Sequence, residues 1–154
     1  MRIELCSPAA EDSARLRSLA LATLAGLTPP GVELSLKDDL VRRLDPEVDL
    51  DFGVELAAIT ASTKTARRAY ELADAYRARG VPTVMGGIHP TALPEEALGH
   101  CDAVVVGEAE LVLRELHRRA AHALRVRVRQ PEIEGVQARE GERAVAVAQL
   151  CRVV

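Results

Sequence analysis

The sequence has few aromatic residues, no tryptophan and no excess of positive charge. Only Phe52, Tyr70 and Tyr76 are aromatic among 154 residues, and the formal net charge at pH 7 is −3. Proteins that bind single-stranded nucleic acid stack the bases on exposed aromatic rings, and duplex binders need clustered Lys and Arg. Both absences argue against nucleic acid as a partner, and they predict a core of aliphatic side chains and alanine.

Cysteines and long hydrophobic runs are also scarce. Cys6, Cys101 and Cys151 lie far apart, and their odd number fits neither a disulfide framework nor a metal-binding motif. No stretch approaches the ~18 uncharged apolar residues that a membrane span requires. The N-terminus lacks the apolar core of a signal peptide. We therefore expect free thiols, no membrane segment and a cytoplasmic protein.

Apolar residues, 48% of the chain, form short strand-like runs that alternate with helix-like stretches. Strands are expected at residues 2–6, 32–36, 54–60, 81–85 and 103–106. Helices are expected from Ser13 to Gly26, from Ala66 to Gly80, at 95–98, and beyond Gly107, where Val112, Leu113, Leu116 and Ala120 share one face. In the second of these helices Arg67, Arg68, Glu71 and Asp74 are expected to point outward. Residues 38–53 are acidic and suit a solvated connection, and 88–94 suit a loop bounded by prolines.

Strands that alternate with helices pair in parallel, because parallel neighbours need crossover connections. Residues 1–122 are therefore expected to form one α/β domain, a Rossmann-like or flavodoxin-like sheet of five parallel strands with helices on both faces. Beyond His122 strand-like alternation takes over, first at 124–129. Residues 123–154 are expected to form a small appended antiparallel ribbon, with strands at 133–139 and 143–148.

Three polar loops, 60–65, 86–91 and 107–110, follow expected strands. The carboxyl ends of parallel strands meet at one edge of the sheet, where such folds bind ligands. Gly86-Gly87 can let a ligand approach the backbone, although a double glycine also suits a plain tight turn. The Ser62-Thr63-Lys64-Thr65 run suits either ligand contact or a helix cap. No Gly-x-x-x-x-Gly-Lys or Gly-x-Gly-x-x-Gly motif is present, which argues against common phosphate and dinucleotide sites.

In combination these segments closely resemble one family, the cobalamin-binding-type domain found N-terminal in cobalamin-dependent radical S-adenosylmethionine proteins. The order and spacing of four segments account for the resemblance: Ile59-Thr60-Ala61-Ser62-Thr63, Val84-Met85-Gly86-Gly87-Ile88-His89-Pro90-Thr91, Pro94–Leu98 and Asp102–Glu110. Residues 131–136 and 139–142 are similar to the short ribbon that follows this domain in the family.

The resemblance implies a cobalamin-binding module. The Asp-x-His-x-x-Gly motif of methionine-synthase-type domains is absent. The resemblance therefore implies cobalamin bound base-off, with its nucleotide tail buried at the sheet edge and no protein histidine on the cobalt. His89 is expected either to line the corrin or tail or to order its own loop. The implied cofactor-binding residues are Ser7, Thr60, Ser62, Thr63, Thr65, Gly86, Gly87, His89, Pro90, Thr91, Gly107, Glu108 and Glu110. No residue is expected to ligate a metal or to be catalytic.

The radical half of that family begins with a Cys-x-x-x-Cys-x-x-Cys motif whose thiolates hold an iron–sulfur cluster. This motif is absent here, so no such cluster is expected on this chain. We therefore expect a cofactor-holding or carrier domain, not catalytic alone, that works with a separate radical S-adenosylmethionine or methyltransferase partner. The alternative is a cofactor-free Rossmann-like domain for protein–protein interaction. A homodimer is compatible with either.

Overall fold

A computed structural model describes residues 1–10, 19–107, 136–137 and 144–147. The strands are β1 (Arg2–Ser7), β2 (Glu33–Asp38), β3 (Leu56–Thr60), β4 (Thr83–Gly86), β5 (Ala103–Val106), β6 (Val136–Gln137) and β7 (Ala144–Val147). The helices are α1 (Leu19–Leu27), α2 (Ala66–Ala78), α3 (Ile88–Ala92) and α4 (Pro94–Leu98). Within this part of the chain, no helix has the length and apolar character needed to cross a membrane.

The strands form one sheet in the order β2-β1-β3-β4-β5-β7-β6. The first five pair in parallel, which confirms the predicted five-stranded α/β fold. The strand order reverses between β1 and β3, as in flavodoxin-like sheets, whose ligands bind at the carboxyl ends on either side of that point. β6 and β7 form the expected antiparallel pair, and β7 pairs in parallel with β5, so the ribbon extends the sheet. The boundary at residue 122, the alternating segment 124–129 and the helix after Gly107 lie outside the described residues.

Most element boundaries match the prediction to within two residues. β4 begins at Thr83 because Pro82 has no N–H for the ladder, although its carbonyl still accepts the Ala57 N–H at 2.9 Å. The loop expected at 88–94 is wrong in part, because residues 88–92 form the single helical turn α3. Pro90 lies in the first turn of α3, where its missing N–H has no partner to lose.

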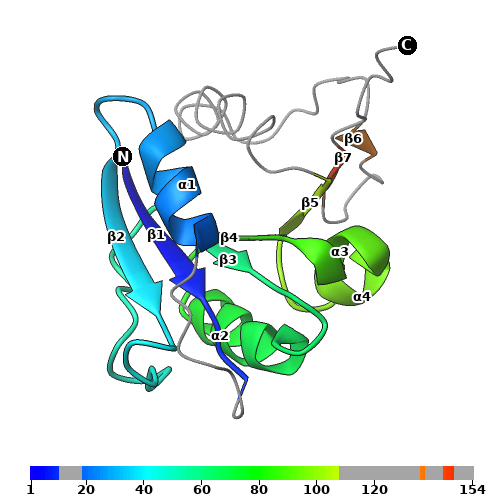
Figure 1. Ribbon diagram of the computed structural model, residues 1–154, viewed down its shortest axis with the longest axis horizontal. Helices are drawn as coiled ribbons and strands as arrows, with labels where there is room; N and C mark the ends of the chain where they lie inside the picture. The colour runs from blue at the N-terminus through cyan, green and yellow to red at the C-terminus, as the bar shows by residue number, and fades with distance from the viewer. Residues whose placement is uncertain (11–18, 108–135, 138–143, 148–154) are drawn as a thin grey trace.

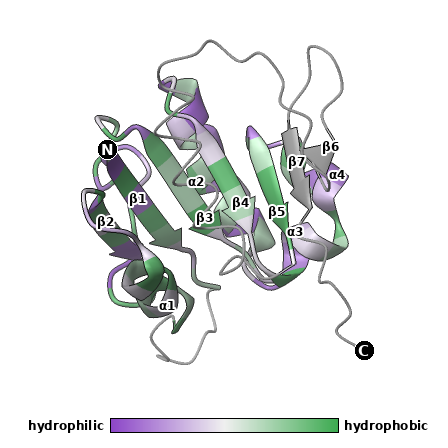
Figure 2. Ribbon diagram, turned by 90° about the horizontal axis from the view of Figure 1, so that it is seen from above, coloured by the Kyte–Doolittle hydropathy of each residue, from purple (hydrophilic) through white to green (hydrophobic). Residues whose placement is uncertain are grey.

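The two faces of the sheet are covered by different helices (Figure 1). Alternate residues of a strand point to opposite faces. Leu5 and Ala58 face α1, whereas Cys6, Ala57 and Ile59 face α2. This confirms the expectation of helices on both faces, and Figure 2 shows hydrophobic residues concentrated along the central strands.

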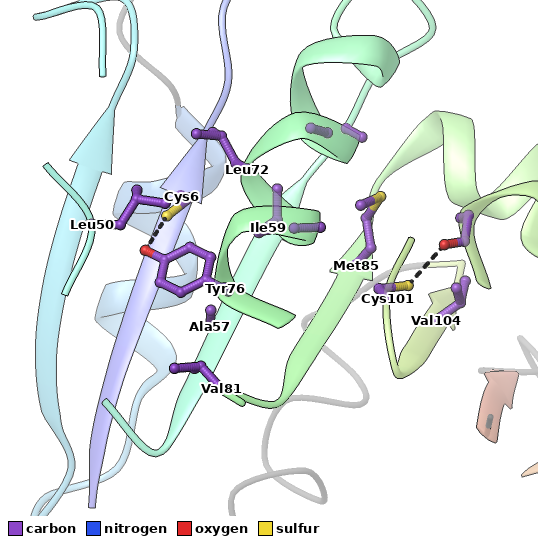
Figure 3. Close-up of a cluster of buried hydrophobic side chains, with 14 of the residues drawn as sticks. Cys6, Leu50, Ala57, Ile59, Leu72, Tyr76, Val81, Met85, Cys101 and Val104 are labelled. Carbon is purple, nitrogen blue, oxygen red and sulfur yellow. Dashed lines mark hydrogen bonds between the residues drawn. The ribbon is translucent and has the colours of Figure 1, made fainter. Parts of the chain in front are cut away.

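The larger part of the core lies between α2 and the sheet (Figure 3). Its side chains are mostly aliphatic, as the shortage of aromatic residues predicts, and Tyr76 is the largest side chain buried there. Phe52 meets the Tyr76 ring edge-on at 5.8 Å between centroids. The α1 side has a smaller cluster around Ile3, Leu5 and Leu21. The described residues therefore fill the face covered by α1 less completely.

Candidate functional site

An apolar cavity of about 600 Å³ lies on the α1 face of the sheet. Its floor is formed by side chains from neighbouring strands, and α1 and α3 provide opposite walls. The floor residues include Leu5, Ala58, Val84 and Val105, and the walls include Ala20, Leu21 and Leu24 of α1 and Ile88, Thr91 and Ala92 of α3. The lining continues to Thr60, Gly86 and Gly107 at the carboxyl ends of β3, β4 and β5. The cavity therefore reaches the edge where the sequence predicted a ligand site.

Small residues in register create the hollow at the centre of the sheet. Ala58 pairs with Leu5 on one side and with Val84 on the other, so three adjacent strands place a short side chain between two larger ones. A Cβ added at Gly86 would meet Val105 Cβ at 3.6 Å, which is an ordinary contact. Gly86 is therefore not required by packing, and its missing side chain leaves space in the cavity.

Gly87 is a glycine for a different reason. Its φ of +108° is a conformation that residues with a side chain rarely adopt. A Cβ there would also lie 2.6 Å from the carbonyl oxygen of Ala61. The two loops are joined further by hydrogen bonds from Ala61 N–H to Gly86 O (2.8 Å) and from His89 N–H to Ala61 O (3.2 Å). Gly87 thus lets the loops after β3 and β4 cross in close contact beside the cavity.

Three hydroxyl groups stand among the cavity residues, on Thr60, Ser62 and Thr91. Thr91 Oγ1 accepts the Gly107 N–H at 3.0 Å and so links α3 to the end of β5. Ser62 and Thr65 bond each other, with Ser62 N–H donating to Thr65 Oγ1 at 2.9 Å. The Thr60 hydroxyl makes no hydrogen bond to any other described residue. Among the described residues it is therefore a polar group at an apolar cavity that has no hydrogen-bond partner.

The structure brings together six of the predicted site residues and separates others from them. The cavity is lined by Thr60, Ser62, Gly86, Gly87, Thr91 and Gly107. Ser7, Thr65 and Pro90 are not among its lining residues, and Thr63 and His89 line a second hollow. Glu108 and Glu110 lie outside the described residues.

The second hollow, of about 470 Å³, lies on the outer side of α2, α3 and α4. The His89 ring is buried there, with Nε2 2.9 Å from Tyr70 Oη and 3.3 Å from Glu96 Oε1. Tyr70 donates to Glu96 at 3.0 Å and stacks on His100 at 4.1 Å between centroids. Burial and then the neighbouring Glu96 carboxylate raise the pKa of Tyr70, so its hydroxyl keeps its proton. No three potential ligands among the described His, Cys, Asp and Glu residues form a metal site.

Three of the described charged residues, Glu4, Asp39 and Arg68, are buried and were not predicted as structural centres, and the expectation of a solvated connection at 38–53 is wrong for Asp39. Arg68 was expected to point outward, but this is wrong, because its guanidinium is buried against Asp39, with Nε 3.0 Å from Oδ2. Glu4 is fully buried in β1 and accepts hydrogen bonds from Tyr76 and Ser35 and from the Asp51 N–H. The burial of Glu4 could have been predicted from its position between apolar neighbours in a strand.

Three further cavity residues, Ala58, Ala61 and Ile88, were not among the predicted site residues. Ile88 is 76% exposed, which is unusual for a large apolar side chain, and it begins α3 at the wall of the cavity. Small residues such as Ala58 have no local signature of a site, since alanine is equally common in a filled core.

Comparison with known proteins identifies similar sequences. The sequence model of the family described as B12 binding domain matches residues 29–117. Bacteriochlorophyllide d C-8(2)-methyltransferase of Chlorobaculum tepidum is 41% identical over 92 residues, which are 60% of this chain and 20% of that protein. Bacteriochlorophyllide d C-12(1)-methyltransferase of the same organism is 36% identical over 99 residues, 64% of this chain and 21% of that protein. The chain thus spans about a fifth of the length of the curated relatives it matches. No solved structure matches the chain significantly.

Proposed function

The chain belongs to the B12 binding domain family, and from this premise we propose that it holds cobalamin in the cavity between α1 and α3. The nucleotide tail is buried against the sheet, and the cobalt receives no histidine from the protein. The bound cofactor serves a methyl-transfer reaction completed by a catalytic partner. The cavity at the carboxyl edge of β3, β4 and β5 is the observation that supports this function most directly.

The chemistry of the cavity fits the tail of cobalamin. The tail ends in a flat, largely apolar benzimidazole ring joined to a polar ribose and phosphate. Leu5, Ala58 and Val84 offer an apolar floor for the ring, and burying apolar surface is favourable by roughly 25 cal/mol per Å². The hydroxyl of Thr60, which has no partner among the described residues, offers a hydrogen bond to the polar part, and Ser62 offers another.

In this proposal the predicted site residues have different roles. Thr60, Ser62 and Thr91 bind the tail, while Gly86 and Gly107 present bare backbone near the corrin. Residues outside the cavity act from behind its wall. Thr65 supports the binding loop through its bonds to Ser62. When bound, cobalamin supplies a cobalt centre that can carry a methyl group.

The position of His89, the described histidine beside the cavity, supports the proposal that the protein provides no ligand to cobalt. His89 belongs to the loop-and-helix segment beside the cavity, but its Nε2 is engaged by Tyr70 and Glu96 on the outer side of α3. A ring held in this way does not reach the cavity. This supports cobalamin bound without a protein histidine.

The role of a carrier rests on the relatives. Both are methyltransferases by name, and about four fifths of each lies outside the match. We infer that the catalytic groups come from a partner, a radical S-adenosylmethionine protein or another methyltransferase. The chain itself provides the pocket and presents the corrin at the open edge of the sheet.

The test is retention of hydroxocobalamin after desalting, measured by visible absorbance, with Ala58→Leu as the blocking variant. Leucine at position 58 projects into the cavity, so it displaces the tail without removing a hydrogen bond. Cobalamin affinity should fall at least about tenfold, the effect of some 1.4 kcal/mol. Ala78→Leu, on the exposed end of α2, is the matched control and should bind as the wild type does.

Two results would contradict the proposal. If the wild-type chain retains no pigment at micromolar concentration, the cofactor-free interaction domain becomes the better function. If Ala58→Leu binds as tightly as Ala78→Leu, the tail does not occupy this cavity. Electron paramagnetic resonance of the Co(II) form tests the coordination, because a nitrogen ligand on cobalt would split the signal.

A further inference from the structure

Helix α3 separates the apolar cavity from the outer hollow described above. Ile88 and Thr91 line the cavity on one side, and His89 lines the outer hollow on the other. The helix has only five residues. A helix of one turn is unstable in isolation because nucleation costs more than its few hydrogen bonds return. The position of this cavity wall must therefore be set by contacts to the rest of the fold.

On the cavity side, Thr91 holds α3 to the end of β5, because its Oγ1 accepts the Gly107 N–H at 3.0 Å. On the outer side, the His89 ring holds α3 to α2 and α4, because its Nε2 lies 2.9 Å from Tyr70 Oη and 3.3 Å from Glu96 Oε1. Because Tyr70 directs its own proton to Glu96, His89 Nε2 is the donor toward this pair. The side chain of His89 is only 7% exposed, so the imidazole is buried, whereas the Glu96 side chain is half exposed.

The partners of His89 belong to firmly packed elements. Tyr70 is in α2, which buries Ala69, Leu72 and Tyr76 against the sheet. Glu96 is in α4, whose Ala97 and Leu98 are buried in the same core. The ring of His89 thus connects a short wall helix to two elements that the core holds in place.

We propose that His89 is a positioning residue, which fixes α3 through Tyr70 and Glu96 and thereby sets the distance between the α3 wall and the sheet. This inference rests on the proposed function for its effect on cobalamin, but the anchoring itself is a property of the chain alone. The side chain acts from behind the wall and does not touch the cofactor. Loss of the anchor lets Ile88 and Thr91 shift, so the cavity fits its ligand less well.

The experiment compares His89→Leu, His89→Gln and Tyr70→Phe. His100→Gln is the control for the surroundings of the anchor: it removes the ring that stacks on Tyr70 and bonds Asp74 at 2.8 Å, but it leaves the hydroxyl contact between Tyr70 and His89 in place. One measurement is the cobalamin dissociation constant from absorbance titration. The other is amide hydrogen exchange at Leu93, whose N–H donates to His89 O at 2.9 Å, in the cofactor-free chain. Exchange at Ala69 in α2 reports whether the fold at large has changed.

His89→Leu and Tyr70→Phe should each weaken cobalamin binding about tenfold and accelerate exchange at Leu93 by a similar factor, the effect of one partly buried hydrogen bond. The double variant should be no weaker than His89→Leu, because both changes break the same contact. His89→Gln keeps an N–H donor and should restore affinity to within about threefold. His100→Gln should match the wild type, and exchange at Ala69 should stay constant throughout.

Unchanged exchange at Leu93 in both His89→Leu and Tyr70→Phe would overturn the inference. So would a loss of cobalamin affinity in His89→Leu and His89→Gln that Tyr70→Phe does not share, since the ring would then contact the cofactor directly. If the wild-type chain binds no cobalamin while exchange at Leu93 still accelerates, the anchor stands and the proposed function fails.

Discussion

Replacing Asp39 with asparagine should show how strongly one buried carboxylate holds the carboxyl edge of the sheet together. Asp39 follows β2 and is 4% exposed. It accepts the Leu44 N–H at 2.7 Å, the Ala9 N–H at 3.1 Å and Arg68 Nε at 3.0 Å. One side chain thus joins the segments after β1 and β2 to helix α2.

The expected loss of stability in Asp39→Asn follows from the donors and the charge that the substitution leaves without a partner. An amide nitrogen cannot accept, so at least one of the three donors loses its partner. The Arg68 side chain, only 10% exposed, keeps Glu71 at 3.1 Å but loses its buried counter-charge. Removing one member of a buried ion pair costs about 3–5 kcal/mol. Because Glu71 remains, we expect the lower end, about 3 kcal/mol, a large part of the roughly 5–15 kcal/mol that stabilises a typical domain.

The pH dependence gives the sign of the effect. Burial alone would raise the pKa of Asp39, but hydrogen bonds from Arg68, Leu44 and Ala9 outweigh it and lower the pKa. A carboxyl group with a lowered pKa stabilises the fold above its unfolded value of about 3.9, and this stabilisation is lost as the pH falls through the folded pKa. The free energy of unfolding of the wild type should therefore exceed that of Asp39→Asn by about 3 kcal/mol at neutral pH. The difference should be smaller below about pH 4.

Urea unfolding followed by circular dichroism measures both values. The control is Asp74→Asn, because the Asp74 side chain is half exposed and its ion pair with Arg77 is worth about 1 kcal/mol or less. The reasoning is refuted if Asp39→Asn costs no more than Asp74→Asn at neutral pH. It is equally refuted if the Asp39→Asn loss is the same in acid as at neutral pH.

Three further substitutions or modifications test the structure. Gly87→Ala should lower the free energy of unfolding in urea by about 2–4 kcal/mol, because the φ of Gly87 is +108° and a carbonyl oxygen blocks the added Cβ. The control Gly31→Ala should lower it by about 1 kcal/mol, because Gly31 has φ +93° but open space around it. Equal losses in the two variants would contradict this account. Tyr76→Phe should cost about 1–3 kcal/mol, because it removes the hydroxyl that donates to the buried Glu4, and a stabilised variant in the same assay would refute that role. Burial raises the pKa of the Cys6 thiol to about 12, so iodoacetamide should alkylate Cys6 only after unfolding, as peptide mass spectrometry can measure; equal labelling of the native chain would contradict its burial.

Much of the sheet could be predicted because two of its central strands, β3 and β5, contain uninterrupted apolar runs. Leu56-Ala57-Ala58-Ile59 and Ala103–Val106 have no alternation, and a strand covered on both faces needs none. The ends of the strands were harder to predict, because they depend on single residues such as Pro82, after which β4 begins. The orientation of Arg68 could not be predicted, because its partner Asp39 lies 29 residues earlier and meets it only in the folded chain.

The candidate site shows the same division between local and tertiary information. Thr60, Ser62 and Gly86 follow strands, and the geometry of a parallel sheet places them at one edge, so their proximity was predictable. The direction of His89 was not. As part of a loop it was free to face the ligand edge, but residues 88–92 form a helical turn. That turn directs residue 89 away from the side occupied by residues 88 and 91.

The cavity depends on the register in which β3 pairs with β1 and β4, and this register cannot be read from the sequence of any one strand. Ala57 and Ala58 are adjacent and chemically identical, yet they have opposite surroundings. Ala57 is fully buried in the core beneath α2, whereas Ala58 is paired between Leu5 and Val84 on the face where α1 leaves a hollow. A shift of one residue in the pairing of β3 would turn Ala57 and Ile59 toward α1 and Ala58 toward α2. Two neighbouring alanines therefore have different tasks, and Ala58, rather than Ala57, is the position where a larger side chain should block a ligand and leave the fold intact.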